Sequence, residues 1–234
     1  MSEEDRSAGA GPWGAATPSD PLPAREPMFN APWPALAIVA IIIAAYILQI
    51  SLAPGDAANA WAFAPADLDH GRWPSLFTAM FIHVSWAHAL MNALAALAFG
   101  PPVARLMGPG WKGPLLFFLF YLACGVIADL GYAAVHLHSL TTAAGASGAI
   151  TGLMGGAARL LGPEARPIAP IVSRSVISLA LGLVVVSLLT GLFGAPLAAG
   201  VRIGWEAHIA GFVAGVLLIG PFARLAGWRR IARL

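Results

Sequence analysis

Long apolar runs alternate with short polar segments along the chain from about residue 34 onward. A helix that crosses a hydrocarbon core of about 30 Å needs roughly 20 mostly apolar residues, and this pattern predicts six such helices. We expect them at residues 34–53, 86–106, 114–136, 146–161, 175–198 and 206–224. Pro101 and Pro102 should loosen the last turn of the second helix. The fourth is short at ~1.5 Å per residue, so a polar side chain in it could lie below the surface without facing lipid.

Composition agrees with this pattern. The chain has 234 residues, of which 59% are hydrophobic and 10% charged, and its mean hydropathy is +0.77. These values are typical of integral membrane proteins rather than soluble domains. We therefore predict an all-α polytopic membrane protein with a bundle of six transmembrane helices. A net charge of +2 is too small to indicate nucleic acid as a partner, and the single cysteine, Cys124, is expected to be a small core residue.

The distribution of basic residues predicts the orientation in the membrane, because cytoplasmic loops carry an excess of Lys and Arg. With the N-terminus inside, only Arg72 and Arg202 lie in outer segments. Eleven of the 13 basic residues lie in inner ones: Arg6, Arg25, Arg105, Lys112, Arg159, Arg166, Arg174, Arg224, Arg229, Arg230 and Arg233. This favours six crossings with both termini in the cytoplasm. The apolar and aromatic segment 54–85 is then extracytoplasmic and is expected to lie partly in the bilayer interface.

The domain organisation follows from these assignments. Residues 1–30 are acidic and rich in Pro, Gly and Ala, which predicts a disordered cytoplasmic tail rather than a cleaved signal peptide. Residues 31–226 form the membrane domain, and 227–234 form a basic cytoplasmic tail. No repeat of 20 to 50 residues supports a transporter with internal symmetry. Walker and HExxH motifs are missing from the sequence, so no nucleotide, cofactor or metal is expected.

A few polar side chains stand inside the predicted membrane helices, where they are costly unless they are paired or functional. His88 and Asn92 in "HALMN" are four residues apart and share a helix face. Ser147 lies in "GASG", and His208 begins "HIAGFVAG". The helices that carry Ser147 and His208 both have small residues four apart, a spacing that lets helices pack closely: Gly148 and Gly152, and Gly211 and Gly215. If these faces meet, Ser147 and His208 come together near the outer ends of their helices.

Such a contact would have a chemical use. A hydroxyl becomes a good nucleophile when a base within ~3 Å takes its proton, and a neutral imidazole suits that role near pH 7. His208 could then return the proton to a leaving amine, while His88 and Asn92 stabilise the oxyanion. Taken alone, each residue also has a structural explanation, since Ser often bonds to its own helix and an interfacial His is often a polar anchor. Asp129, the one acid in the predicted membrane core, could orient a base or pair with a nearby donor.

At these residues the sequence resembles the rhomboid family of intramembrane serine proteases. The three motifs occur in the family's order on the expected helices, and the resemblance covers about residues 34–224. It implies that Ser147 is the nucleophile and His208 the general base of a Ser-His dyad. It also implies that His88 and Asn92 stabilise the oxyanion together with the Ser147 backbone N–H. Gly145 matches the glycine two residues before the nucleophile, and Gly211 the glycine that permits close helix packing.

Two positions depart from the family pattern. Some members carry an aromatic residue four positions after the serine, stacked on the catalytic histidine, whereas this chain has Thr151. The ring of His208 must then be oriented by another group, for which a hydroxyl is one candidate. The first loop reads Arg72-Trp73, the reverse of the Trp-Arg order associated with the family, which leaves the role of Arg72 in that loop open.

The resemblance implies an endopeptidase of the bacterial inner membrane that cleaves peptide bonds in or beside transmembrane segments of other membrane proteins. Small and helix-breaking residues would lie near the cut, the site would open to the extracytoplasmic side, and the helix at 175–198 would be a lateral gate for substrate. Three alternatives remain open at this point. They are an inactive relative that binds or escorts membrane helices, a small transporter or channel, and a metal hydrolase using His83, His88, His136 and His138.

Overall fold

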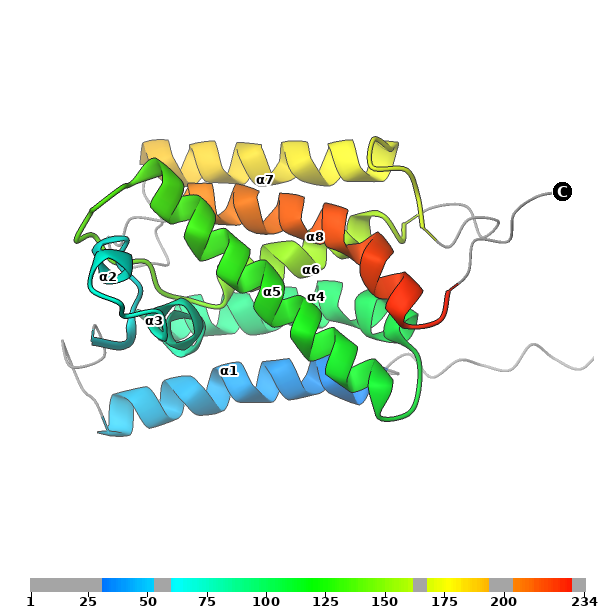
Figure 1. Ribbon diagram of the computed structural model, residues 1–234, viewed down its shortest axis with the longest axis horizontal. Helices are drawn as coiled ribbons and strands as arrows, with labels where there is room; N and C mark the ends of the chain where they lie inside the picture. Colours follow the sequence, from blue (N-terminus) through cyan, green and yellow to red (C-terminus); the bar gives the residue numbers. More distant parts are fainter. Residues whose placement is uncertain (1–30, 53–59, 162–167, 194–203, 229–234) are drawn as a thin grey trace, which may run out of the picture. The chain divides into compact units, whose positions relative to one another are not determined.

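The computed structural model describes residues 31–52, 60–161, 168–193 and 204–228. The regular elements of these residues are helices, shown in Figure 1, with one isolated antiparallel bridge between Phe63 and Ala143. They are α1 (Trp33–Leu52), α2 (Ala66–Asp69), α3 (Ser75–Thr78), the 3₁₀ helix η2 (Ala79–Phe81), α4 (Trp86–Met107), α5 (Lys112–Val135), α6 (Ser147–Ala158), α7 (Arg174–Phe193) and α8 (Trp205–Leu225). The predicted all-α class is confirmed.

The six longer helices correspond one to one to the six apolar runs of the sequence. By length and composition, four of the described helices could cross a membrane: α1, α4, α5 and α8. Helix α6 has only 12 residues, and α7 counts as a shorter apolar helix over Arg174–Thr190, so six crossings stay a prediction. Helix α4 continues through Pro101 and Pro102 to Met107. The predicted N-terminal tail, the helix end at 194–198 and most of the C-terminal tail lie outside the described residues.

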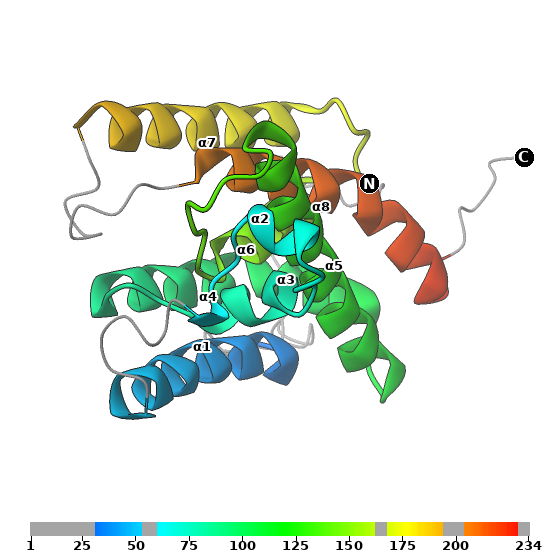
Figure 2. The same ribbon diagram turned by 60° about the vertical axis from the view of Figure 1, so that its left-hand side comes forward.

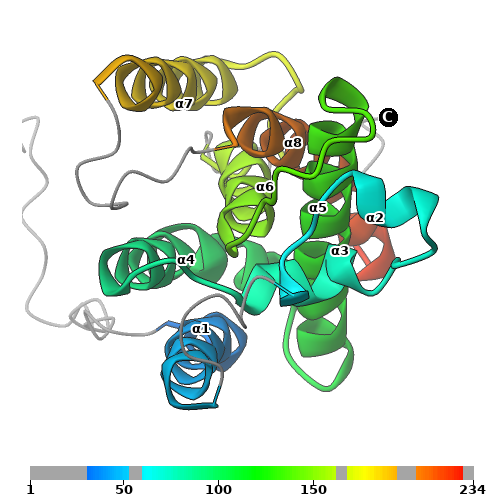
Figure 3. The same cartoon turned by 90° about the vertical axis from the view of Figure 1, so that its left-hand side faces the viewer.

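Helix α6 is the centre of the bundle. It packs against α4, α5 and α8, and Figure 3 shows it between these three helices. Ten of its 12 residues are buried, which is possible because most of them are Gly or Ala and let the neighbouring backbones come close. Helix α5 runs obliquely across α4, α6 and α8 (Figure 1) and contacts all three. The contacts of α6 with its neighbours are therefore made largely by small side chains, while larger ones such as Phe117, Phe120 and Ile219 fill the rest of the core.

Helix α7 is attached to the bundle mainly through α6 and α8, and Figure 2 shows it beside α8 and apart from α4. Val176 in its first turn is buried against Ala158, Phe212 and Val216. At the same end, the Ser175 hydroxyl donates to the carbonyl oxygen of Ala158 at 2.7 Å. Further along α7, Val184, Val185, Val186, Leu188 and Leu189 are exposed. Its first turns are thus held more firmly than the rest.

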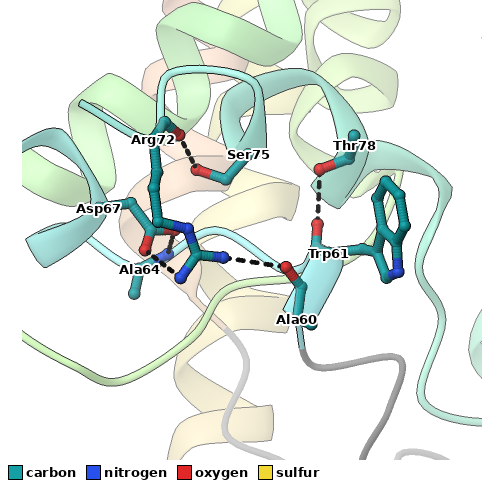
Figure 4. Close-up of polar contacts among 7 residues, drawn as sticks. All are labelled: Ala60, Trp61, Ala64, Asp67, Arg72, Ser75 and Thr78. Atoms are coloured by element: carbon teal, nitrogen blue, oxygen red, sulfur yellow. Dashed lines mark hydrogen bonds and ion pairs between the residues drawn. The ribbon is translucent and has the colours of Figure 1, made fainter. Parts of the chain in front are cut away.

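Residues 60–81, which precede α4, form short helices linked by polar contacts (Figure 4). The Arg72 guanidinium forms an ion pair with Asp67 at 3.3 Å and donates to the carbonyl oxygen of Ala60 at 3.0 Å. The Asp67 carboxylate also accepts from the backbone N–H of Ala64 at 3.1 Å. Arg72 therefore ties two turns of this loop together, although it comes before the tryptophan rather than after it.

Candidate active site

Ser147 and His208 are in hydrogen-bond contact. Ser147 is the first residue of α6 and His208 lies in the first turn of α8, and the distance from Ser147 Oγ to His208 Nε2 is 2.8 Å. Both residues are half-buried, so the pair is shielded without being sealed off. A hydroxyl at this distance from an imidazole nitrogen can pass its proton to the ring. The geometry is that of a nucleophile and its base.

The backbones of α6 and α8 touch just below this pair. A Cβ atom added to Gly211 would overlap the carbonyl oxygen of Gly148, and one added to Gly215 would overlap the carbonyl oxygen of Gly152. Helices approach to this degree only where both lack side chains at the contact. Because Gly148 follows Ser147 directly and Gly211 is three residues after His208, the glycine contact sets the separation of the two polar side chains.

His88 and Asn92 lie against the backbone just before Ser147. A Cβ atom on Gly145 would be 2.9 Å from His88 Nε2 and 3.7 Å from Asn92 Nδ2. Gly145 also has a φ of +123°, a conformation that side chains rarely adopt, and its N–H donates to the carbonyl oxygen of Ala79 at 2.9 Å. Glycine is therefore required here for both backbone conformation and space.

The start of α4 fixes the direction of this polar face. Ser85 is the N-cap of α4, and its hydroxyl accepts from the His88 backbone N–H at 3.1 Å, as N-cap serines do. His88 and Asn92 follow one turn apart on the same helix. Asn92 is buried, and its Nδ2 and the Nδ1 of His88 have no hydrogen-bond partner among the described residues. Asn92 Nδ2 is thus a free donor near Ser147.

Thr151 faces its own helix. Its hydroxyl donates to the carbonyl oxygen of Gly148 at 2.9 Å, the local bond that Thr often forms in membrane helices. On the neighbouring helix, Glu206 Oε1 lies 2.9 Å from His136 Nε2, which connects the first turn of α8 to the end of α5. This hydrogen bond holds the helix segment that carries His208. Sequence reasoning missed Glu206, although an acid in the first turn of a helix is favourable and stood two residues before the candidate base.

Two further contacts near the site were also missed. The Gln49 side chain on α1 makes two hydrogen bonds to the backbone of His83, from Gln49 Nε2 to the carbonyl oxygen at 2.7 Å and from the N–H to Gln49 Oε1 at 2.9 Å. His83 is fully buried, and burial, with a smaller effect of the neighbouring His88, lowers the pKa of His83 to about 4. An amide in the otherwise apolar run of α1 was the signal that could have pointed to this contact.

The remaining histidines and Asp129 lie elsewhere. His138 pairs with Asp69 at 2.8 Å and His136 with Glu206, so the four histidines considered for a metal site do not converge. Among the residues that the structure describes, no group of three or more His, Cys, Asp and Glu side chains could hold a metal ion. Asp129 on α5 has one buried carboxylate oxygen, Oδ2, that lacks a hydrogen-bond partner in the described part of the chain.

Comparison with known proteins identifies relatives of the helical domain. The family model of the rhomboid domain matches residues 70–224. The rhomboid protease GluP of Bacillus subtilis (strain 168) is 32% identical over 117 residues, which are 49% of this chain and 22% of that protein. The putative rhomboid protease YdcA of the same organism is 33% identical over 87 residues, covering 37% of this chain and 40% of the relative. The chain thus spans less than half the length of these curated relatives.

Proposed function

Because the chain belongs to the rhomboid family, we propose that it is an intramembrane serine endopeptidase that cleaves other membrane proteins in or beside their transmembrane segments. The observation that carries the proposal is the 2.8 Å contact between Ser147 Oγ and His208 Nε2. The names of the two relatives add support for protease chemistry, and neither one covers the whole of this chain.

In the proposed reaction, Ser147 Oγ attacks the carbonyl carbon of the scissile bond while His208 Nε2 takes the hydroxyl proton. The tetrahedral intermediate then collapses, and the imidazolium gives its proton to the leaving amine. This step leaves an acyl-enzyme on Ser147. Water, deprotonated by the same imidazole, hydrolyses the ester, and the proton returns to Ser147 Oγ. Two residues thus serve both halves of the reaction, and no cofactor or metal takes part in these steps.

The negative charge of the intermediate would be stabilised from three directions. His88 Nε2 and Asn92 Nδ2 lie beside Gly145, and the Ser147 N–H is at the start of α6, where the helix dipole favours negative charge. Donors that are already in position before the reaction lower the barrier most. The roles of His88 and Asn92 as oxyanion donors belong to the proposal, and their place against the Gly145 backbone supports it.

A transmembrane substrate has to enter the bundle before it can be cut. A scissile bond in a helix is hydrogen-bonded and shielded, so the substrate must unwind near the cut, which favours small and helix-breaking residues there. The weak attachment of α7 beyond its first turns supports this helix as the lateral gate. We place the protein in a bacterial inner membrane with both termini in the cytoplasm and the site open to the extracytoplasmic side. The asymmetry of basic residues supports this orientation.

The test is cleavage of a single-pass membrane protein by the purified chain in liposomes. Wild type should cut, and Ser147→Ala and His208→Ala should not. Ser51→Ala and His138→Ala are matched controls, because the Ser51 hydroxyl donates to the carbonyl oxygen of Ile47 on its own helix and His138 is exposed. Both controls should cut like wild type. A fluorophosphonate probe should label wild type and leave Ser147→Ala unlabelled.

The outcomes separate the alternatives. Cleavage that survives Ser147→Ala would overturn the protease assignment. An inert Ser147 in a protein that still captures membrane helices would indicate a non-catalytic relative. Solute flux through liposomes that survives the same substitution would indicate a transporter. If the probe labels wild type but the model substrate stays intact, Ser147 is still an active nucleophile and only the choice of substrate is wrong.

A further inference from the structure

His83 is a fully buried histidine outside the Ser147–His208 pair. It lies in the turn that precedes α4, and its backbone is held by two hydrogen bonds with Gln49 on α1, one donated by Gln49 Nε2 and one by the His83 N–H. Its ring packs edge-on against two others, with centroid distances of 5.2 Å to His88 and 6.3 Å to Tyr46. The backbone anchor and the ring packing together fix where this imidazole lies, directly behind His88.

Burial of the His83 ring at this position lowers the stability of the fold. Neither of its nitrogens has a hydrogen-bond partner among the described residues, and an unsatisfied buried polar group costs about 1–3 kcal/mol. An apolar side chain of similar size would avoid that cost. Since burial keeps the pKa of His83 near 4, the ring is neutral at pH 7 and offers one N–H donor and one acceptor nitrogen.

His88 has a matching requirement. Its Nε2 lies beside Gly145, so an oxyanion there needs hydrogen on Nε2. In a neutral imidazole the other nitrogen, Nδ1, is then an acceptor. The Nδ1 of His88 is buried and has no partner in the described part of the chain. With the proton on Nδ1 instead, Nε2 would present a lone pair to the oxyanion and repel it. His88 therefore needs a donor at Nδ1.

We propose that His83 is a positioning residue that donates its N–H to Nδ1 of His88, either after a turn of its ring or through one bridging water, and so fixes the tautomer that carries hydrogen on Nε2. Gln49 fixes the position of His83 through its two hydrogen bonds with the His83 backbone. The inference rests on the proposed protease function, because it assigns His83 a task within the oxyanion site. Fixing a tautomer through the second ring nitrogen is how histidines are commonly set for their role.

The first part of the test does not depend on activity. The ring-nitrogen chemical shifts of ¹⁵N-histidine-labelled wild type report which nitrogen of His88 carries the proton, with His88→Ala used for assignment. We expect His88 to carry hydrogen on Nε2 in wild type. In His83→Leu this tautomer should be lost or should mix with the other one, and in His83→Gln it should return. Gln keeps a donor where Leu has none. Hydrogen on Nδ1 of His88 in wild type would overturn the proposal even if no variant folds.

The second part is kinetic. His83→Leu should lower kcat by at least about tenfold, up to the ~10²–10³-fold known for loss of one oxyanion donor, with little change in KM, and His83→Gln should recover most of it. Ile42→Ala is the control for lost stability, because Ile42 is buried on α1 and lies seven residues before Gln49. It should lower the melting temperature without the fall in kcat. Equal kcat in His83→Leu and wild type would refute the positioning role, whereas a wild type that neither cleaves nor reacts with the fluorophosphonate probe would refute the proposed function.

Discussion

Replacing Gly211 with alanine tests whether the glycine contact between α6 and α8 sets the distance between Ser147 and His208. The added Cβ would overlap the carbonyl oxygen of Gly148 and lie 2.7 Å from Thr151 Oγ1. A backbone carbonyl has little freedom to move aside, so the two helices must part by roughly 1 Å before ordinary contact is restored. The Ser147–His208 distance, 2.8 Å in the structure, would then exceed hydrogen-bond length.

Gly211→Ala should lower both the cleavage rate and the stability of the protein. A misplacement of about 1 Å between reacting groups lowers the rate about 10²-fold, which corresponds to roughly 2.7 kcal/mol in the barrier. Overpacking costs about 1–3 kcal/mol of stability, of which the better helix propensity of alanine returns up to ~1 kcal/mol. We therefore expect Gly211→Ala to fold, melt at a lower temperature, and lose nearly all cleavage.

Gly220→Ala is the matched control on the same helix. Apart from its chain neighbours, a Cβ at Gly220 would meet Arg159 Nη1 at 3.7 Å among the described residues, an ordinary contact, so this variant should cleave like wild type. The assay compares initial cleavage rates in liposomes with thermal unfolding in detergent. If Gly211→Ala and Gly220→Ala cleave at the same rate, the argument that touching glycines position the pair is wrong.

Two further predictions concern the outer part of the molecule. The pKa of His83 is about 4 in the folded protein, whereas its ordinary value is 6.5. Between these pH values the unfolded state binds more protons than the folded state. The free energy of unfolding therefore falls as the pH drops below about 6.5, by at most roughly 3 kcal/mol. Melting temperatures between pH 7 and pH 4.5 should fall further for wild type than for His83→Gln, and parallel curves would refute this. Arg72→Gln should cost less than ~1 kcal/mol, because the guanidinium is largely exposed and such ion pairs are weak. A large loss of stability or of cleavage in Arg72→Gln would show that the first loop depends on that contact.

The long helices were predictable from the sequence because an apolar run of sufficient length has few alternatives in a membrane. The expected ends at 53, 106 and 224 differ by one residue from the observed ends of α1, α4 and α8. The fourth helix was expected to reach residue 161 and ends at Ala158. Hydropathy does not register such an end, because Leu160 and Leu161 beyond it are also apolar.

Parts of the site were predictable for a different reason. Glycines four apart on two helices indicate that the helices touch, and that contact implies which polar residues meet. Gln49 and Glu206 stand out as polar residues in apolar runs, but their partners His83 and His136 were not predictable, because each contact joins a helix to a turn whose path no periodicity encodes. The role of Thr151 also depended on its rotamer, which directs the hydroxyl to Gly148. A sequence shows that a hydroxyl is present and leaves its direction open.

The shortness of α6 has a consequence for how the protein responds to its lipid. At ~1.5 Å per residue its 12 residues span about 18 Å, much less than a hydrocarbon core of about 30 Å. A helix in contact with lipid accommodates such a mismatch by tilting or by thinning the bilayer. Helix α6 is enclosed by other helices, so its short length does not deform the bilayer. Changes in bilayer thickness would act on the exposed faces of α1 and α7. Ser147 on α6 would keep its position relative to the helices around it.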